Sequence, residues 1–428
     1  MHKSLFILLF FVTTALTANS PPQSVAFVAF GDSGYHYDYL KPDIIESPMS
    51  SEEFIKDKLT SWIEKPLPAS EFIPPPMYML PATGQTIEAS GALPVARAMD
   101  RFCQSSKCQF ALMLGDNIYP YGATGTEDEV RFKKIFEIPY RKLVGNHPGF
   151  KLYAALGNHD WKTSRVGRDR QIKYGMRADT AFTLNSPGYY RFIKGKVEFF
   201  VIDTNLLLAG TVVKEGELNL DGSEKLLDEI DTPEEWELPN DQEKRQLRWL
   251  EDALKKSTAK WKVVYGHHTL WSAGGSKYQQ AKALRKLITP MICRYADIYI
   301  AGHEHELEVN LDTCTQELGT PHFPLPLVIS GAGAWQRPVH HLFQTFQEIK
   351  YPQYKALWSK GMVWGFSHME IGNDLMTVKM ITTPNSGTGA PEVEKTFNFL
   401  NRSQSIKSQL HFKDIIGKKS KKLMDLSR

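Results

Sequence analysis

Five short clusters of acidic, amide and imidazole side chains recur along the chain, and each begins with glycine. They are GDSG at 31–34, GDNIY at 115–119, GNHD at 157–160, GHH at 266–268 and GHEH at 302–305. Together they supply seven candidate metal ligands, namely Asp32, Asp116, Tyr119, Asn158, His267, His303 and His305. Oxygen and imidazole donors suit hard or borderline metals, whereas thiolates suit soft ones. Seven donors exceed the needs of one ion, so we predict a pair of metal ions that share one carboxylate and clamp a phosphoryl group.

An apolar run directly precedes each cluster. The runs are VAFVAF (25–30), FALML (110–114), LYAAL (152–156), WKVVY (261–265) and ADIYIA (296–301). Short apolar runs bounded by glycine predict buried strands. A single aspartate after a strand is more often a turn former, and a single histidine is usually structural. Five clusters in the same position instead predict one site at the strand ends, where open α/β sheets bind ligands.

The rest of the chain predicts an α/β or α+β layered sandwich. Helical patterns cover 127–144, 242–256 and 279–294, and further strands are predicted at 189–193, 197–202, 325–329, 363–371 and 375–381. Two insertions are predicted to be loops: 41–86, which is dense in proline, and 215–243, which is acidic.

The ordered set of motifs from Asp32 to His305 resembles the calcineurin-like metallophosphoesterases, and within them the small, tartrate-resistant purple acid phosphatases. This resemblance implies a four-layer α/β/β/α sandwich with a dinuclear site at the C-terminal ends of its strands. In the general family the first motif reads DxH, but here Ser33 and Gly34 follow Asp32. The resemblance implies that Tyr119 replaces the missing histidine as a phenolate ligand of Fe(III), whose charge lowers the phenol pKa. The alternative is that Tyr119 is a packed aromatic at a strand end.

The family pattern also implies how the donors divide between the ions. The ferric ion would use Asp32, Asp116, Tyr119 and His305, and the second ion, Fe(II), Zn(II) or Mn(II), would use Asp116, Asn158, His267 and His303. An extended backbone through GHEH would point His303 and His305 to the same side, so that each could serve one ion.

The resemblance implies that a metal-bound hydroxide attacks phosphorus in line while His159, oriented by Asp160, protonates the leaving alcohol. Some relatives carry a second acid histidine in the segment that here reads WSAGGSKYQQ, which contains none. His159 is therefore expected to act alone. For His268, which a threonine follows, contact with substrate and simple packing both stay open.

The predicted function is that of a secreted acid phosphatase acting on phosphate monoesters, either small molecules or phosphoproteins. The alternative is a phosphodiesterase or nucleotide pyrophosphatase on the same scaffold. A non-enzymatic binding module is disfavoured because such a protein would be expected to lose ligands, and every position here is filled. A net charge of +3 is too small to predict a nucleic-acid partner.

The first 18 residues, with a short basic start and an apolar stretch, predict a signal peptide, so the mature protein is expected to be secreted or periplasmic without a membrane anchor. We predict a catalytic domain over 24–400 and a basic tail over 401–428. Export allows disulfides, and we favour Cys103–Cys108 and Cys293–Cys314 among the three possible pairings. The sequence does not predict an oligomeric state.

Overall fold

The computed structural model describes most of the chain between residues 24 and 402. The described ranges are 24–37, 49–208, 213–218, 224–226, 237–238, 241–275, 277–319 and 323–402. The predicted signal peptide and residues 403–428 of the predicted tail lie outside them. Among the helices of the described part, none combines the length and the apolar character needed to cross a bilayer.

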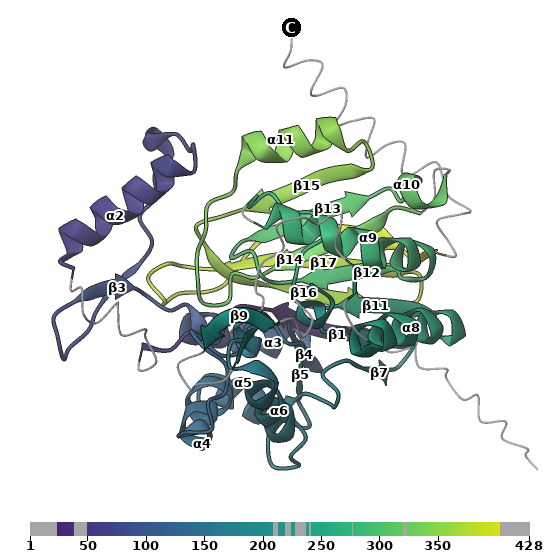
Figure 1. The fold of residues 1–428 in the computed structure, drawn as a ribbon, viewed down its shortest axis with the longest axis horizontal. Helices are drawn as coiled ribbons and strands as arrows, with labels where there is room; N and C mark the ends of the chain where they lie inside the picture. Colours follow the sequence, from purple (N-terminus) through teal and green to yellow (C-terminus); the bar gives the residue numbers. More distant parts are fainter. Residues whose placement is uncertain are drawn as a thin grey trace, which may run out of the picture.

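Two seven-stranded sheets form the centre of the molecule (Figure 1). The first has the order β18 (Glu392–Leu400), β17 (Leu375–Thr383), β16 (Trp364–Ile371), β1 (Val25–Phe30), β4 (Phe110–Met113), β5 (Leu152–Ala154) and β6 (Phe182–Thr183). The second has the order β15 (Tyr354–Lys360), β13 (Leu307–Asp312), β14 (Leu325–Ser330), β12 (Ile298–Ala301), β11 (Trp261–Tyr265), β8 (Val197–Val201) and β7 (Tyr190–Lys194).

Apolar side chains pack the two sheets face to face. Phe27 of β1 stacks on Phe110 of β4, and both rings meet the edge of Phe199 of β8 in the other sheet, with centroids 5.1–5.4 Å apart. Aromatic pairs in this geometry add stability beyond their buried area.

Helices cover the outer faces of the two sheets (Figure 1). The first sheet is covered by α3 (Ala92–Ser106), α5 (Arg141–Asn146) and α6 (Ser164–Gly175), and the second by α8 (Asp241–Lys256) and α9 (Tyr278–Tyr295). Short helices α7 (Thr204–Leu208), α10 (Thr315–Leu318) and α11 (His341–Lys350) complete the outer layers. The expected four-layer α/β/β/α sandwich is confirmed.

The five apolar runs form β1, β4, β5, β11 and β12, as predicted. In the first sheet β1, β4 and β5 are parallel neighbours, and in the second β11 is parallel to β12. The carboxyl ends of parallel strands lie at the same edge of a sheet, so each sheet presents its glycine-led clusters together.

Three expectations about the connecting segments were wrong. The helix predicted at 127–144 is not continuous: α4 (Asp128–Phe132) passes into a π-helix (Lys133–Glu137), and the helix breaks at Pro139, which lacks the N–H that a continuous helix needs, before α5 begins. The acidic segment predicted as a loop contains a two-stranded ladder of β9 (Val213–Leu218) and β10 (Glu224–Leu226). The proline-dense segment predicted as a loop is also partly regular.

Most of that segment belongs to a projecting structure that we call the arm, residues 49–90. It contains α2 (Ser51–Glu64) and the hairpin of β2 (Met77–Met79) and β3 (Thr86–Glu88). Ser50 begins α2 with a capping box, in which its hydroxyl accepts from the Glu53 N–H while the Glu53 carboxylate accepts from the Ser50 N–H. The prolines of the segment lie before and after α2 and none lies inside it, so a high proline content did not exclude a helix here.

Both expected disulfides are present. Cys103–Cys108 joins the end of α3 to the segment before β4, and Cys293–Cys314 joins α9 to the start of α10. All four cysteines are therefore paired, and none is available as a zinc ligand.

Gly34 holds the loop after β1 against the loop that carries Tyr119. Its carbonyl accepts from the Tyr119 N–H at 3.1 Å, and a Cβ at position 34 would lie 2.1 Å from the Asn117 carbonyl oxygen. We expect Gly34→Ala to lower the free energy of unfolding by about 1–3 kcal/mol or more, since two backbones must separate. Gly145→Ala in α5 is the control, because its Cβ would meet no atom within 4 Å. Equal stability of the two variants in urea unfolding would contradict this account.

Candidate metal centre

The seven predicted ligands, drawn from both sheets, lie together at the shared edge of the sandwich. All are buried except Asn158, which is partly exposed. Asp32 and Asp116 both adopt left-handed backbone angles, with φ of 58° and 51°, as they leave β1 and β4. Aspartate tolerates this region better than most residues, and the turn directs both carboxylates inward.

Asp116 lies between two groups of donors. Its Oδ2 accepts a hydrogen bond from the Tyr119 hydroxyl at 2.7 Å, whereas its Oδ1 lies 3.4 Å from Nε2 of His267. The two oxygens of one carboxylate thus face different partners, as expected of a bridging ligand.

The first donor group surrounds the Tyr119 hydroxyl. This hydroxyl lies 3.1 Å from Oδ1 of Asp32 and 3.3 Å from Nε2 of His305, and the latter two atoms are 3.3 Å apart. With Oδ2 of Asp116, the group contains the four side chains that the family pattern assigns to the ferric ion.

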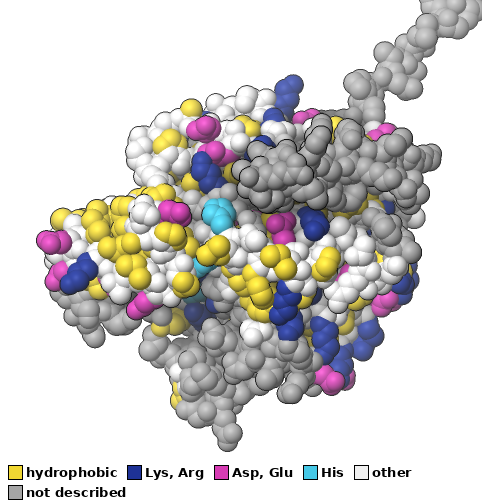
Figure 2. Space-filling model, turned by 90° about the horizontal axis from the view of Figure 1, so that it is seen from above, with side chains coloured by type: hydrophobic (Ala, Val, Ile, Leu, Met, Phe, Trp, Pro, Cys, Tyr) yellow, Lys and Arg dark blue, Asp and Glu magenta, His cyan; other side chains and the backbone are white. Residues whose placement is uncertain are grey.

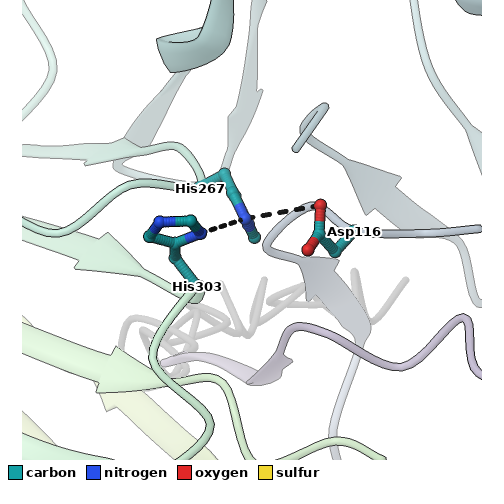
Figure 3. A group of neighbouring side chains, drawn as sticks. All are labelled: Asp116, His267 and His303. Atoms are coloured by element: carbon teal, nitrogen blue, oxygen red, sulfur yellow. Dashed lines mark hydrogen bonds and ion pairs between the residues drawn. The ribbon is translucent and has the colours of Figure 1, made fainter. Parts of the chain in front are cut away.

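The second donor group contains Asn158, His267 and His303; Figure 3 shows both histidines beside Asp116. Nε2 of His267 lies 3.1 Å from Oδ1 of Asn158 and 2.9 Å from Nδ1 of His303. The outer ring nitrogens are already engaged: Nδ1 of His267 lies 2.8 Å from the Leu114 carbonyl, and Nε2 of His303 lies 3.0 Å from Oε1 of Gln280.

These outer partners settle which ring nitrogen carries the proton. A carbonyl and an amide oxygen can only accept, so each outer nitrogen donates its N–H, and the two inner nitrogens of the neutral rings carry lone pairs. Two lone pairs 2.9 Å apart repel each other unless a proton or a cation lies between them. Imidazole ligands held by such outer hydrogen bonds are typical of metal sites.

The two buried carboxylates, Asp32 and Asp116, also favour positive charge in the site. Burial, assisted by Asp116, raises the pKa of Asp32 to about 8. Burial would lower the pKa of His267, but Asp116 and Asp32 outweigh it and raise that pKa to about 9. Burial and the same two carboxylates raise the pKa of Tyr119 well above its usual value. The two carboxylates thus favour a proton or a cation beside them, and the oxygen and imidazole donors of the two groups fit two metal ions.

His159 stands beside the first donor group without belonging to it. Its Nδ1 lies 2.7 Å from the Pro120 carbonyl and therefore donates, its ring packs 4.2 Å from that of Tyr119, and its Nε2 is 3.9 Å from Oδ2 of Asp116. Burial lowers its pKa to about 4. Nε2 is the nitrogen left to exchange a proton with a substrate.

Two expectations about neighbouring residues are corrected. Asp160 does not orient His159, because its carboxylate accepts from the backbone N–H groups of Gly157, Asn117 and Ile118 and so ties the third motif to the second. GHEH is not extended, since His303 has a φ of 69°. The resulting bend, and not strand alternation, sends His303 to one donor group and His305 to the other.

For His268 the packing alternative holds. The side chain is buried, its Nδ1 lies 2.8 Å from the Thr204 hydroxyl, and its ring packs 4.3 Å from that of His303. It supports a predicted ligand from behind and does not line the cleft described below.

Sequence reasoning missed two residues that complete the site. Gln280 lies at the start of α9 and fixes the ring of His303, and Arg337 is held at the rim because its backbone N–H donates to the His305 carbonyl at 3.1 Å. Neither lies in a glycine-led cluster, so no local pattern indicated them.

A family model described as calcineurin-like phosphoesterase matches residues 90–307, about half of the chain. The chain belongs to this family. Purple acid phosphatase 4 of Arabidopsis thaliana is 25% identical over 262 residues, which cover 60% of this chain and 68% of the relative. Purple acid phosphatase 7 of the same plant is 29% identical over 252 residues, covering 56% and 66%. The predicted resemblance to the purple acid phosphatase type is confirmed, and the chain spans about two thirds of the length of these relatives.

Solved structures agree at the level of the fold. GAP50, described as the anchor in the inner membrane complex of Plasmodium, has a TM-score of 0.53 at 15% identity and covers 88% of this chain and 89% of its own. A structure of PhoD has a TM-score of 0.53 at 12% identity, with 90% and 71% covered. Identities this low show the sandwich alone.

Gln280 allows a test of the second donor group that does not depend on turnover. We expect Gln280→Leu to weaken binding of a divalent ion about 10- to 100-fold, because the His303 ring loses the acceptor that fixes its tautomer. Titration of metal-free protein with Zn(II) measures the change. The exposed neighbour Gln279, changed to Leu, is the matched control. Identical affinities in both variants would remove Gln280 from the site.

Proposed function

We propose that the chain is an exported, dinuclear acid phosphatase that hydrolyses phosphate monoesters. The observation that supports the proposal most is the position of Asp116 between the two donor groups. One of its oxygens faces Tyr119 in the first group, and the other faces His267 in the second group. Two donor groups that share one carboxylate suit paired metal ions better than a single ion.

Asp32, Tyr119 and His305 would hold one ion and Asn158, His267 and His303 the other, with Asp116 between them. Bound ions would supply Lewis-acid stabilisation of the phosphoryl group and an activated water at acidic pH. Tyr119 favours Fe(III) in the first position, because a phenolate is a hard, anionic oxygen donor. The second position, with imidazole and amide donors, suits Fe(II), Zn(II) or Mn(II).

The protein's own contribution to bond cleavage centres on His159. The Nδ1–H group of His159 donates a hydrogen bond to the Pro120 carbonyl, so Nε2 is the nitrogen that can exchange a proton with the substrate. Lys162 Nζ lies 3.5 Å from this Nε2 and adds positive charge where a phosphate dianion would bind. The leaving alcohol of a monoester needs a proton as it departs, and Nε2 of His159 is placed to give it when the ring is protonated at acidic pH.

The fold alone does not decide between catalysis and binding, since a neighbour described as an anchor shares it. The retained donor set supports the enzyme. Export is supported by the two disulfides, which suit an oxidising compartment. The predicted signal peptide remains a prediction outside the described residues.

The decisive assay compares hydrolysis of a mono- and a bis-(4-nitrophenyl) phosphate at acidic pH. We expect the monoester to be preferred, and His159→Asn to lower its kcat about 10²- to 10⁴-fold with metal content retained, because the leaving group loses its acid. The control is His341→Asn, an exposed histidine at the start of α11. Preference for the diester, or full activity of His159→Asn, would overturn the proposal.

The ferric assignment has a spectroscopic signature. We expect protein purified without added metal to contain iron and to absorb visible light through charge transfer from the Tyr119 phenolate. Tyr119→Phe should lose this band because it removes the only oxygen of that side chain, whereas Tyr121→Phe should retain it. Colourless, iron-free protein that still hydrolyses monoesters would contradict Fe(III) but not the dinuclear site.

A further inference from the structure

A cleft of about 600 Å³ leads from the surface to the first donor group. Tyr119, His159 and His305 form its inner end, and Arg337 with Met362 lines one side. The opposite wall is the arm, which supplies Lys58, Trp62, Lys65 and Phe72. Figure 2 shows the arm as a lobe at the left, with hydrophobic side chains gathered on it and a hollow between it and the body.

Besides Lys162 near the position of the phosphoryl group, three positively charged side chains line the cleft: Lys58, Lys65 and Arg337. Lys58 is paired with Glu88, since its Nζ lies 3.6 Å from a carboxylate oxygen. Lys65 forms no ion pair with any carboxylate of the described residues. Lys65 is an exposed residue that lines the cleft together with Arg337. Partial desolvation and then the charge of Arg337 lower the pKa of Lys65, whereas the carboxylates of Glu304 and Glu306 act in the opposite direction.

Backbone hydrogen bonds fix the position of Arg337 at the side of the cleft. Its backbone N–H donates to the His305 carbonyl and its carbonyl accepts from the Met362 N–H at 2.8 Å, so the residue is fixed at both ends. Its guanidinium nevertheless has only a distant partner, with Nη1 3.9 Å from Glu304 Oε2 and the side chain 35% exposed. At that distance there is no hydrogen bond, and the planar donors remain available to an anion in the cleft.

The arm also supplies a fixed apolar surface next to these cations. Trp62 donates its Nε1–H to the Pro68 carbonyl at 2.9 Å and meets the edge of Phe72 at 5.5 Å. On the facing side Tyr35 stacks on Trp335 at 4.1 Å. Flat aromatic surfaces on both sides suit a planar or apolar leaving group.

We propose that the arm and Arg337 form a subsite for the leaving group, selecting phosphate esters in which a planar or apolar part carries a second anionic group that Lys65 and Arg337 bind. The inference rests on the proposed function for the position of the scissile phosphate. The second anion is a carboxylate or a phosphate; both accept the same donors.

Selectivity, and not activity alone, tests the subsite. We compare kcat/KM for phenyl phosphate, 4-carboxyphenyl phosphate and 1,4-phenylene bisphosphate. We expect the wild-type protein to prefer the doubly anionic esters, and Arg337→Gln or Lys65→Gln to reduce that ratio about tenfold, chiefly through KM. Lys56→Gln, an exposed lysine of α2 outside the cleft, should leave the ratio unchanged. The ester with the larger preference identifies the second anion as carboxylate or phosphate.

A binding measurement separates failure of the subsite from failure of the phosphatase assignment. Calorimetry compares 4-phosphonobenzoate with phenylphosphonate, neither of which can be hydrolysed as an ester. Tighter binding of 4-phosphonobenzoate that depends on Arg337 supports the subsite even if no ester is cleaved. Hydrolysis of phenyl phosphate with no preference for a second anion, unchanged in Arg337→Gln and Lys65→Gln, overturns the subsite and leaves the phosphatase in place.

Discussion

Repulsion between buried donors is the constraint on which the rest of this structure depends. Nε2 of His267 and Nδ1 of His303, which both carry lone pairs when the rings are neutral, face each other at 2.9 Å, and Asp32 and Asp116 are buried close to the same point. Without cations, extra protons relieve this repulsion, and the pKa values of Asp32 and His267 are raised accordingly. Burying such a cluster makes the free energy of folding less favourable, and bound metal ions would offset this cost by stabilising the folded state.

The sandwich provides the rigidity that such a cluster needs. Three parallel strands of one sheet and two of the other end at a common edge, and the glycine-led turns that follow them supply one or two donors each. Further contacts fix three of these donors: Leu114 holds the ring of His267, Gln280 holds the ring of His303, and the His303 N–H donates to Asp32 at 2.8 Å. Side chains on strand ends, held from behind in this way, are more precisely placed than side chains on free loops.

The sequence predicted the parts of the fold that rest on local pattern. Five apolar runs became five strands, and the seven donors came together, because strand burial and strand-end geometry follow from neighbouring residues. Features that depend on tertiary contacts were not predictable. Pro139 divided a periodic helix, the bend at His303 replaced an extended segment, and Asp160 was already occupied by three backbone N–H groups. Gln280 and Arg337 meet the site only through folding, and no motif marks them.

The arm separates the chemistry of the site from its selectivity. The two sheets fix the positions of the seven ligand side chains. Small shifts in these positions would change the electrostatic interactions among the ligands. The metal centre therefore has little freedom to adapt to a particular leaving group. α2 and its hairpin, by contrast, project from the sandwich and form the far wall of the cleft (Figure 1). Changes in Lys65, Trp62 or Phe72 would alter what enters without touching any donor. Substrate choice in this protein is therefore expected to reside in the arm and in Arg337, and not in the metal ligands.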